Sequence, residues 1–163
     1  MTPTTTKTLY DTDFALWIDE TVDRLKAGDF AAIDLDNLIE EVESLGISQR
    51  KSVHSFLVRL LEHLLKRCYV PFIVNRSLST CNVLPDSYRG WEIEIRNFRN
   101  ELKKEFKYSP SLKSFLVGIF GESYGEALES VREDYPDTSF PDVCPFAKDV
   151  DTLLTEKFWQ ERK

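Results

Sequence analysis

The spacing of apolar residues between Val53 and Cys68 constrains the fold of this chain more than any other feature. Apolar side chains recur there at intervals of three and four residues, which places them on one wide face of an α-helix. The face comprises Val53, Phe56, Leu57, Leu60, Leu61, Leu64 and Cys68, and it is widened by Val58 and Leu65. Pro71 stops the helix. The pattern predicts a long central helix that packs against neighbours on more than one side.

The flanking segments show the same period, so the sequence predicts an all-α bundle of about five to six helices with an aromatic, Pro-rich C-terminal tail. Gly28 and Gly46 stand where left-handed residues end helices. We therefore expect helices 34–46 and 48–70 to be separate, which would allow them to pack as a hairpin. The expected helices are 12–28 after a cap at Asp11 or Thr12, 34–46 after a cap at Asp34, 48–70, 86–108, 110–135 with a break near Gly121, and a short helix around 150–154.

The domain organisation follows from the same elements. Residues 1–9 are predicted to form a flexible N-terminus, and residues 10–163 a single helical domain. Residues 72–87 lack a regular period and are predicted to be a loop between helices. Phe140, Phe146, Phe158 and Trp159 indicate that the tail is held against the bundle.

Charge is distributed unevenly along the chain. The net charge of −7 argues against an affinity of the whole molecule for nucleic acid or anionic lipid. Residues 1–46 carry 3 basic and 11 acidic side chains, residues 47–113 carry 13 and 6, and residues 114–163 carry 5 and 11. The chain is thus acidic, then basic, then acidic. One interpretation is that oppositely charged helices pack side by side and partly neutralise each other. The alternative is a basic helix face offered to a phosphate or an acidic partner.

The expected compartment is the cytoplasm. Cys68, Cys81 and Cys144 are widely spaced, without a C-x-x-C pair, and are interpreted as reduced thiols. The N-terminus lacks the apolar core of a signal peptide, and no apolar run approaches the length of a membrane span.

Candidate site residues come from the acidic helix 34–46 and the central helix. The densest acidic run comprises Asp34, Asp36, Glu40, Glu41 and Glu43. If the two helices pack as a hairpin, Glu41 or Glu43 reaches His63 from the neighbouring helix. One hypothesis is a metal site of Glu41, Glu43, His63 and Asp13, with Lys66 stabilising a developing anion. The other is a structural Glu–His pair that sets helix register. Di-iron bundles need two E-x-x-H pairs, which this chain lacks.

Other catalytic and binding patterns are weak. Neither G-x-S-x-G nor a plausible Cys–His motif is present. The glycines from Gly118 to Gly125 lack the Lys-Ser or Lys-Thr of a phosphate loop. Basic residues on the helices 48–70 and 86–108 have too few interleaved aromatic residues to predict nucleic-acid binding.

Several blocks in the chain together resemble a known family. They are YDTDFALWIDE, DLDNLIEEVESLG, LLEHLLKRCYVP, a Trp followed by IRNFR, SPSL, and FPDVCPF ahead of FW. Their order is similar to that of the bacterial family labelled domain of unknown function 29, which is especially expanded in cyanobacteria. The resemblance runs from Tyr10 to Trp159, with a longer loop at residues 72–87. It implies an all-helical single domain and no particular activity, cofactor or catalytic residue.

Two functional hypotheses follow. The preferred one is a small acidic, cytoplasmic interaction or regulatory module that binds another protein, for example a basic toxin, with a homodimer left open and no cofactor expected. No membrane or nucleic-acid partner is expected. The alternative is a metal-dependent hydrolase or nuclease-like enzyme that uses Glu41 and His63.

Overall fold

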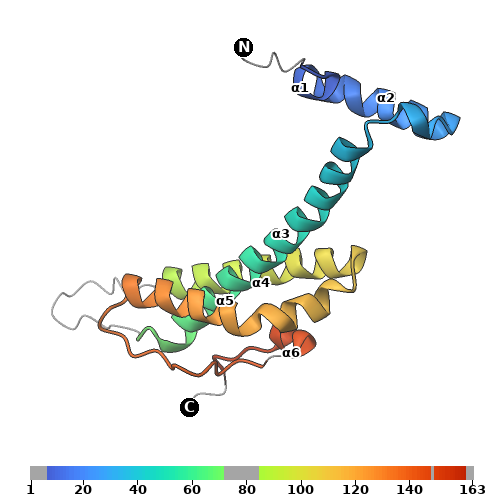
Figure 1. The fold of residues 1–163 in the computed structure, drawn as a ribbon. Coiled ribbons are helices and arrows are strands. Elements are labelled where there is room, and N and C mark those ends of the chain that lie inside the picture. The colour runs from blue at the N-terminus through green and yellow to red at the C-terminus, as the bar shows by residue number, and fades with distance from the viewer. Residues whose placement is uncertain (1–6, 72–84, 148, 161–163) are drawn as a thin grey trace, which may run out of the picture. The chain divides into compact units, whose positions relative to one another are not determined.

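The computed structural model describes residues 7–71, 85–147 and 149–160, and the regular structure of these residues is entirely helical, as predicted (Figure 1). Contacts within the chain group into two compact units, Met1–Ser48 and Gln49–Lys163. We call the first unit the arm and the second the body. The sequence predicted one domain from residue 10 onward, whereas the contacts form these two groups.

The arm contains short helices and the beginning of a long one. Helices α1 (Leu9–Thr12) and α2 (Phe14–Ala27) precede the 3₁₀ turn η1 (Phe30–Ala32), and α3 begins at Leu35. The carboxylate of Asp13 caps α2 by accepting from the backbone N–H of Leu16 at 3.0 Å, slightly later than the predicted cap. Gly28 ends α2 with a φ of 73°, which confirms its predicted role.

Helix α3 runs without interruption from Leu35 to Tyr69, so the prediction of a helix end at Gly46 is wrong. Gly46 does not have the positive φ of a left-handed cap. A glycine inside a helix costs only about 1 kcal/mol relative to alanine, and no proline follows until Pro71. Continued backbone hydrogen bonding outweighs that cost. A hairpin of helices 34–46 and 48–70 is therefore not formed.

The body is built around the C-terminal half of α3. Helices α4 (Pro85–Tyr108), α5 (Leu112–Asp134) and α6 (Val150–Thr155) complete it. Val53, Leu57, Leu60, Leu61, Leu64 and Leu65 on α3 are all 0% exposed, which confirms the predicted central helix. Phe140 and Phe146 of the tail are buried, and Phe158 and Trp159 pack against the same core, as expected.

The predicted break near Gly121 is wrong, because α5 continues through all three of its glycines. Its buried face, which includes Leu116, Phe120 and Tyr124, packs in the core and holds the backbone helical on both sides of Gly121. Residues 72–84 of the predicted loop and residues 1–6 of the predicted flexible N-terminus lie outside the described residues. The last three residues of the predicted loop, 85–87, belong to α4, so this end of the prediction is wrong. In the part of the chain that the structure describes, no helix combines the length and apolarity needed to cross a membrane.

Candidate functional site

The candidate residues in the arm have structural or solvent-exposed positions. Glu41 accepts a hydrogen bond of 2.6 Å from the hydroxyl of Tyr10, and this bond raises the pKa of Tyr10 to about 12. Asp13 caps α2, as described above. Glu40 and Glu43 are exposed on α3. Glu41 and Asp13 therefore hold local helix contacts within the arm, while Glu40 and Glu43 contribute negative charge at its surface.

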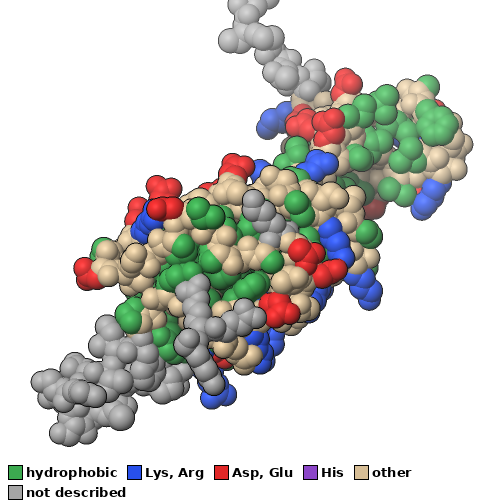
Figure 2. All heavy atoms as spheres, turned by 90° about the horizontal axis from the view of Figure 1, so that it is seen from below, with side chains coloured by type: hydrophobic (Ala, Val, Ile, Leu, Met, Phe, Trp, Pro, Cys, Tyr) green, Lys and Arg blue, Asp and Glu red, His purple; other side chains and the backbone are tan. Residues whose placement is uncertain are grey.

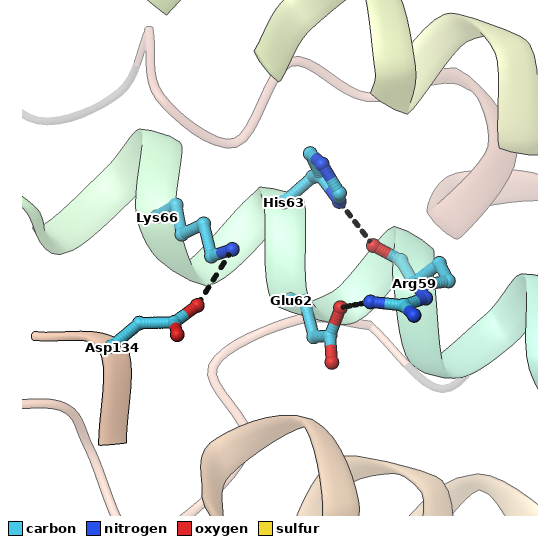
Figure 3. Close-up of polar contacts among 5 residues, drawn as sticks. All are labelled: Arg59, Glu62, His63, Lys66 and Asp134. Atoms are coloured by element: carbon cyan, nitrogen blue, oxygen red, sulfur yellow. Dashed lines mark hydrogen bonds and ion pairs between the residues drawn. The ribbon is translucent and has the colours of Figure 1, made fainter. Parts of the chain in front are cut away.

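His63 lies on the body section of α3 and is half-buried (Figure 3). Its Nδ1 is 2.7 Å from the carbonyl oxygen of Arg59, and its ring lies 5.5 Å from that of Phe98. A carbonyl oxygen can only accept a hydrogen bond, so Nδ1 of His63 is the donor and carries the proton. Burial lowers the pKa of His63 below its ordinary value. The contacts with Arg59 and Phe98 orient the imidazole against α4.

Lys66 connects α3 to the end of α5. Its Nζ is 3.2 Å from a carboxylate oxygen of Asp134 and 5.9 Å from the centre of the Tyr135 ring (Figure 3). The Lys66 side chain is mostly buried, at 15% exposed, whereas that of Asp134 is 54% exposed. Lys66 thus fixes the C-terminal end of α5 against the central helix, a long-range contact that helical spacing alone does not reveal.

The structure does not assemble the hypothetical metal ligands. The contact from Glu41 or Glu43 to His63 depended on the hairpin, and α3 is one continuous helix instead. Within residues 7–71, 85–147 and 149–160, no group of three or more His, Cys, Asp or Glu side chains is arranged to hold a metal ion. A histidine–glutamate contact does form elsewhere: Nε2 of His54 lies 2.9 Å from Oε1 of Glu126.

The sequence patterns did not single out Glu62, whose carboxylate is buried in the structure. Glu62 is 4% exposed, and its Oε2 is 3.0 Å from Nη1 of Arg59, whose side chain is 60% exposed (Figure 3). The available signal was its position between Leu61 and Leu64 in a run of buried leucines. A buried carboxylate needs a partner, and Arg59 provides one from the preceding helical turn. We assign this pair a structural role.

The apolar surface of the arm is its most unusual property. Among the described residues, 15 large hydrophobic side chains are exposed, and 11 of these belong to the arm. Figure 2 shows hydrophobic side chains at the surface in this part of the chain, with acidic ones beside them. The set comprises Phe14, Leu16, Ile18, Val22, Leu25, Phe30, Leu35, Ile39, Val42, Leu45 and Ile47. Such an accumulation is typical of an interaction surface.

Local contacts order the start of the arm. The ring of Tyr10 lies 5.0 Å from that of Trp17 and 5.6 Å from that of Phe14, and Phe14 stacks on Trp17 at 5.6 Å. Trp17 is 6% exposed, yet its buried Nε1 has no hydrogen-bond partner in the described part of the chain. This aromatic cluster and the Tyr10–Glu41 bond hold the helices of the arm in place while most of its apolar side chains stay exposed.

These features define a class of protein: an all-α chain with a packed helical body and an acidic arm that exposes apolar helix faces. The match to a family model is consistent with this class and spans residues 9–159. The chain belongs to the family described as Domain of unknown function DUF29, which confirms the resemblance found in the sequence. No curated protein and no solved structure shows significant similarity to it.

Proposed function

We propose that this chain is a helical protein-interaction module, and that its arm binds a basic, amphipathic helix of another protein. The single observation that carries the proposal is the exposure of 11 large hydrophobic side chains on the arm. Covering a fully exposed side chain of this kind contributes about 1.5–3 kcal/mol, so covering several half-exposed ones supplies enough free energy for specific binding. As expected from the sequence, we place the module in the cytoplasm.

The spacing of the exposed residues supports a helical partner. On α2, Phe14, Ile18, Val22 and Leu25 recur at three and four residues, and on α3, Leu35, Ile39, Val42 and Leu45 do the same. Each set marks an apolar stripe along a helix. An apolar stripe of one helix packs well against that of another, and this is a common mode of peptide recognition.

Charge favours a basic partner over a second copy of this chain. The arm carries 3 basic and 11 acidic residues, a net charge of −8. Two such arms would repel each other on approach, whereas lysine and arginine residues beside the apolar stripe of a partner would be attracted. Glu43 is exposed beside the stripe of α3, and Glu40 is exposed on the opposite side of the same helix; neither forms an ion pair with any described residue. Glu43 is therefore available to contact such a partner, and Glu40 adds to the negative charge that attracts it.

The test compares two double variants in quantitative pull-downs from the lysate of the native host. Val42→Gln/Leu45→Gln removes apolar surface from the arm and keeps good helix formers. Val117→Gln/Val143→Gln is the matched control, because it removes two exposed apolar side chains from the body. The arm variant should recover at least about tenfold less of a partner that the wild type captures, since a loss of 1.4 kcal/mol in binding free energy corresponds to a factor of ten. The control should retain it.

A second pair of measurements tests the chemistry of the partner. Glu40→Lys/Glu43→Lys should weaken binding of the same partner, and raising the salt concentration should weaken binding to the wild type. The partner should contain a basic amphipathic segment that binds as an isolated peptide. Equal retention by the arm and control variants would overturn the proposal. Concentration-dependent dimerisation of the purified chain that Val42→Gln/Leu45→Gln abolishes would instead assign the arm to a second copy.

A further inference from the structure

A row of cationic side chains lies along one face of α4 in the body. Arg89, Arg96 and Lys103 are spaced seven residues apart, which is close to two helical turns, so they lie on the same face. They line a groove of about 490 Å³ together with Arg99 on the same helix and Lys157 from the segment after α6. We call these five residues and the hollow that they line the cationic groove.

The charges in the cationic groove are poorly balanced. Glu92 is the one acidic side chain among the described residues that line it, and Glu92 already pairs with Arg67 at 2.6 Å. Arg89, Arg96, Lys103 and Lys157 have no ion-pair partner among the residues that the structure describes. By contrast, the neighbouring Lys104 on α4 pairs with Glu101 at 2.6 Å outside the groove. Positive charge is therefore concentrated where carboxylates are scarce.

Arg99 provides an independent observation. Its side chain is 8% exposed, and its Nη2 donates a hydrogen bond of 2.6 Å to the carbonyl oxygen of Glu156. Its buried Nε has no hydrogen-bond partner among the described residues, and no described carboxylate forms an ion pair with it. Burial lowers the pKa of this guanidinium. A buried cation with unused donors is costly, and an anionic ligand would compensate it.

The groove also has an apolar part. Ile93, Leu154 and Trp159 line it, and the guanidinium of Arg67 lies 5.3 Å from the centre of the Trp159 ring. A volume of about 490 Å³ falls in the range of sites for small molecules, which are mostly apolar with a few convergent polar groups. The groove thus offers several cations for one end of a ligand and an aromatic surface for the other.

We infer that the cationic groove binds a small organic phosphate, a molecule that joins phosphate groups to an aromatic or other apolar part. Arginine forks match the geometry of phosphate oxygens, and several unpaired cations suit a multiply charged anion better than a single carboxylate. A nucleic acid is the less favoured occupant, because its long backbone must approach a chain with a net charge of −7. This inference concerns the body and does not depend on the proposed role of the arm.

The test is calorimetric titration of the full chain at physiological salt with three probes: adenosine triphosphate, inorganic tripolyphosphate and a short single-stranded DNA oligonucleotide. The variant is Arg96→Gln/Lys103→Gln, which removes two exposed groove cations. Its matched control is Lys51→Gln/Lys104→Gln, which removes the same charge from exposed positions that do not line the groove. Thermal unfolding of both variants should match that of the wild type, because all four side chains are exposed.

We expect adenosine triphosphate to bind, and the groove variant to weaken its binding by about tenfold or more through the loss of charge-assisted contacts. The control should change it less than about twofold, in keeping with screened, distant charges. Tripolyphosphate should bind more weakly than adenosine triphosphate, because it lacks a group for the apolar part of the groove. Absence of binding at millimolar probe, or equal weakening by both variants, would overturn the inference. Tighter, groove-dependent binding of the oligonucleotide would reassign the groove to nucleic acid.

Discussion

The arm and the body use similar amphipathic helices in opposite ways. Of the 22 buried hydrophobic residues in the described chain, the arm supplies only Trp17, and the body supplies the others. The arm has a net charge of −8, whereas the body, with 18 basic and 17 acidic residues, has a net charge of +1. An apolar stripe therefore marks a helix face that folding or binding will cover. The stripe alone does not show whether the chain itself or a partner covers it.

This difference has consequences for stability. In the body, α3, α4, α5 and α6 contribute to one core, so a change on any of these helices affects the whole unit. In the arm, the described contacts are mostly local, such as the aromatic cluster around Trp17. Segments with few buried apolar contacts open at low free-energy cost. A partner that covered the arm would therefore stabilise it more than a partner would stabilise the body.

The largest expected effect contrasts one leucine from each unit. Leu61→Ala in the body should lower the free energy of unfolding by about 2–5 kcal/mol, because the side chain is 0% exposed and leaves a cavity. Leu45→Ala in the arm should change it by less than about 0.5 kcal/mol, since Leu45 is 72% exposed. Urea unfolding followed by circular dichroism measures both. Similar losses for the two variants would mean that the chain covers the arm in solution.

Smaller effects of opposite sign are expected at two glycines of the arm. Gly28→Ala should lower the free energy of unfolding by about 1 kcal/mol, because Gly28 has a φ of 73° that alanine adopts poorly. Gly46→Ala should stabilise α3 by roughly 0.5–1 kcal/mol, because Gly46 lies inside the helix and an added Cβ meets no atom within 4 Å. Helix content and thermal unfolding report both changes. A loss of helicity in Gly46→Ala would contradict the continuous helix.

The smallest effect is a pH dependence in the body. His63 has a pKa below 6.5 in the folded chain, chiefly because it is partly buried, so the unfolded chain binds more protons between the two pKa values. The contribution of neutral His63 to the free energy of unfolding is therefore fully present above about pH 6.5, and it decreases as the pH falls toward the folded pKa. His63→Asn should flatten this part of the stability profile.

NMR titration of the imidazole signals measures the folded pKa of His63 directly. Urea unfolding of the wild type and of His63→Asn, carried out at neutral and mildly acidic pH, provides the stability comparison. An NMR value at or above 6.5, or identical pH profiles for the two proteins, would contradict the burial that lowers the pKa of His63.

Much of the fold could be predicted because its signals are local. The leucines of the central helix, the cap at Asp34, the end of α2 at Gly28 and the end of α4 at Tyr108 all depend on residues within one or two turns. The same local rules failed at Gly46 and Gly121. A glycine only permits a helix to end there, and whether the helix ends depends on the packing and hydrogen bonding of the residues around it.

The candidate site was harder to predict because its contacts are distant in the chain. Glu41, His63 and Lys66 were candidates for a metal site or a structural pair, whereas their partners in the structure are Tyr10, Arg59 and Asp134. The pairing of Glu41 with His63 assumed a turn that does not form. Glu62 was missed because a single acidic residue among leucines looks like a solvent-exposed position until the neighbouring helices are in place.

The sequence by itself determined the helical class, the apolar stripe of each helix, the acidic character of the arm and the family membership. All of these follow from residue type and from a period of 3.6 residues. Only the tertiary structure decided which stripes are covered, that His54 meets Glu126 from 72 residues away, and that Arg99 is buried beside a groove of unpaired cations. Burial and charge balance depend on neighbours brought together by folding, and no local period encodes them.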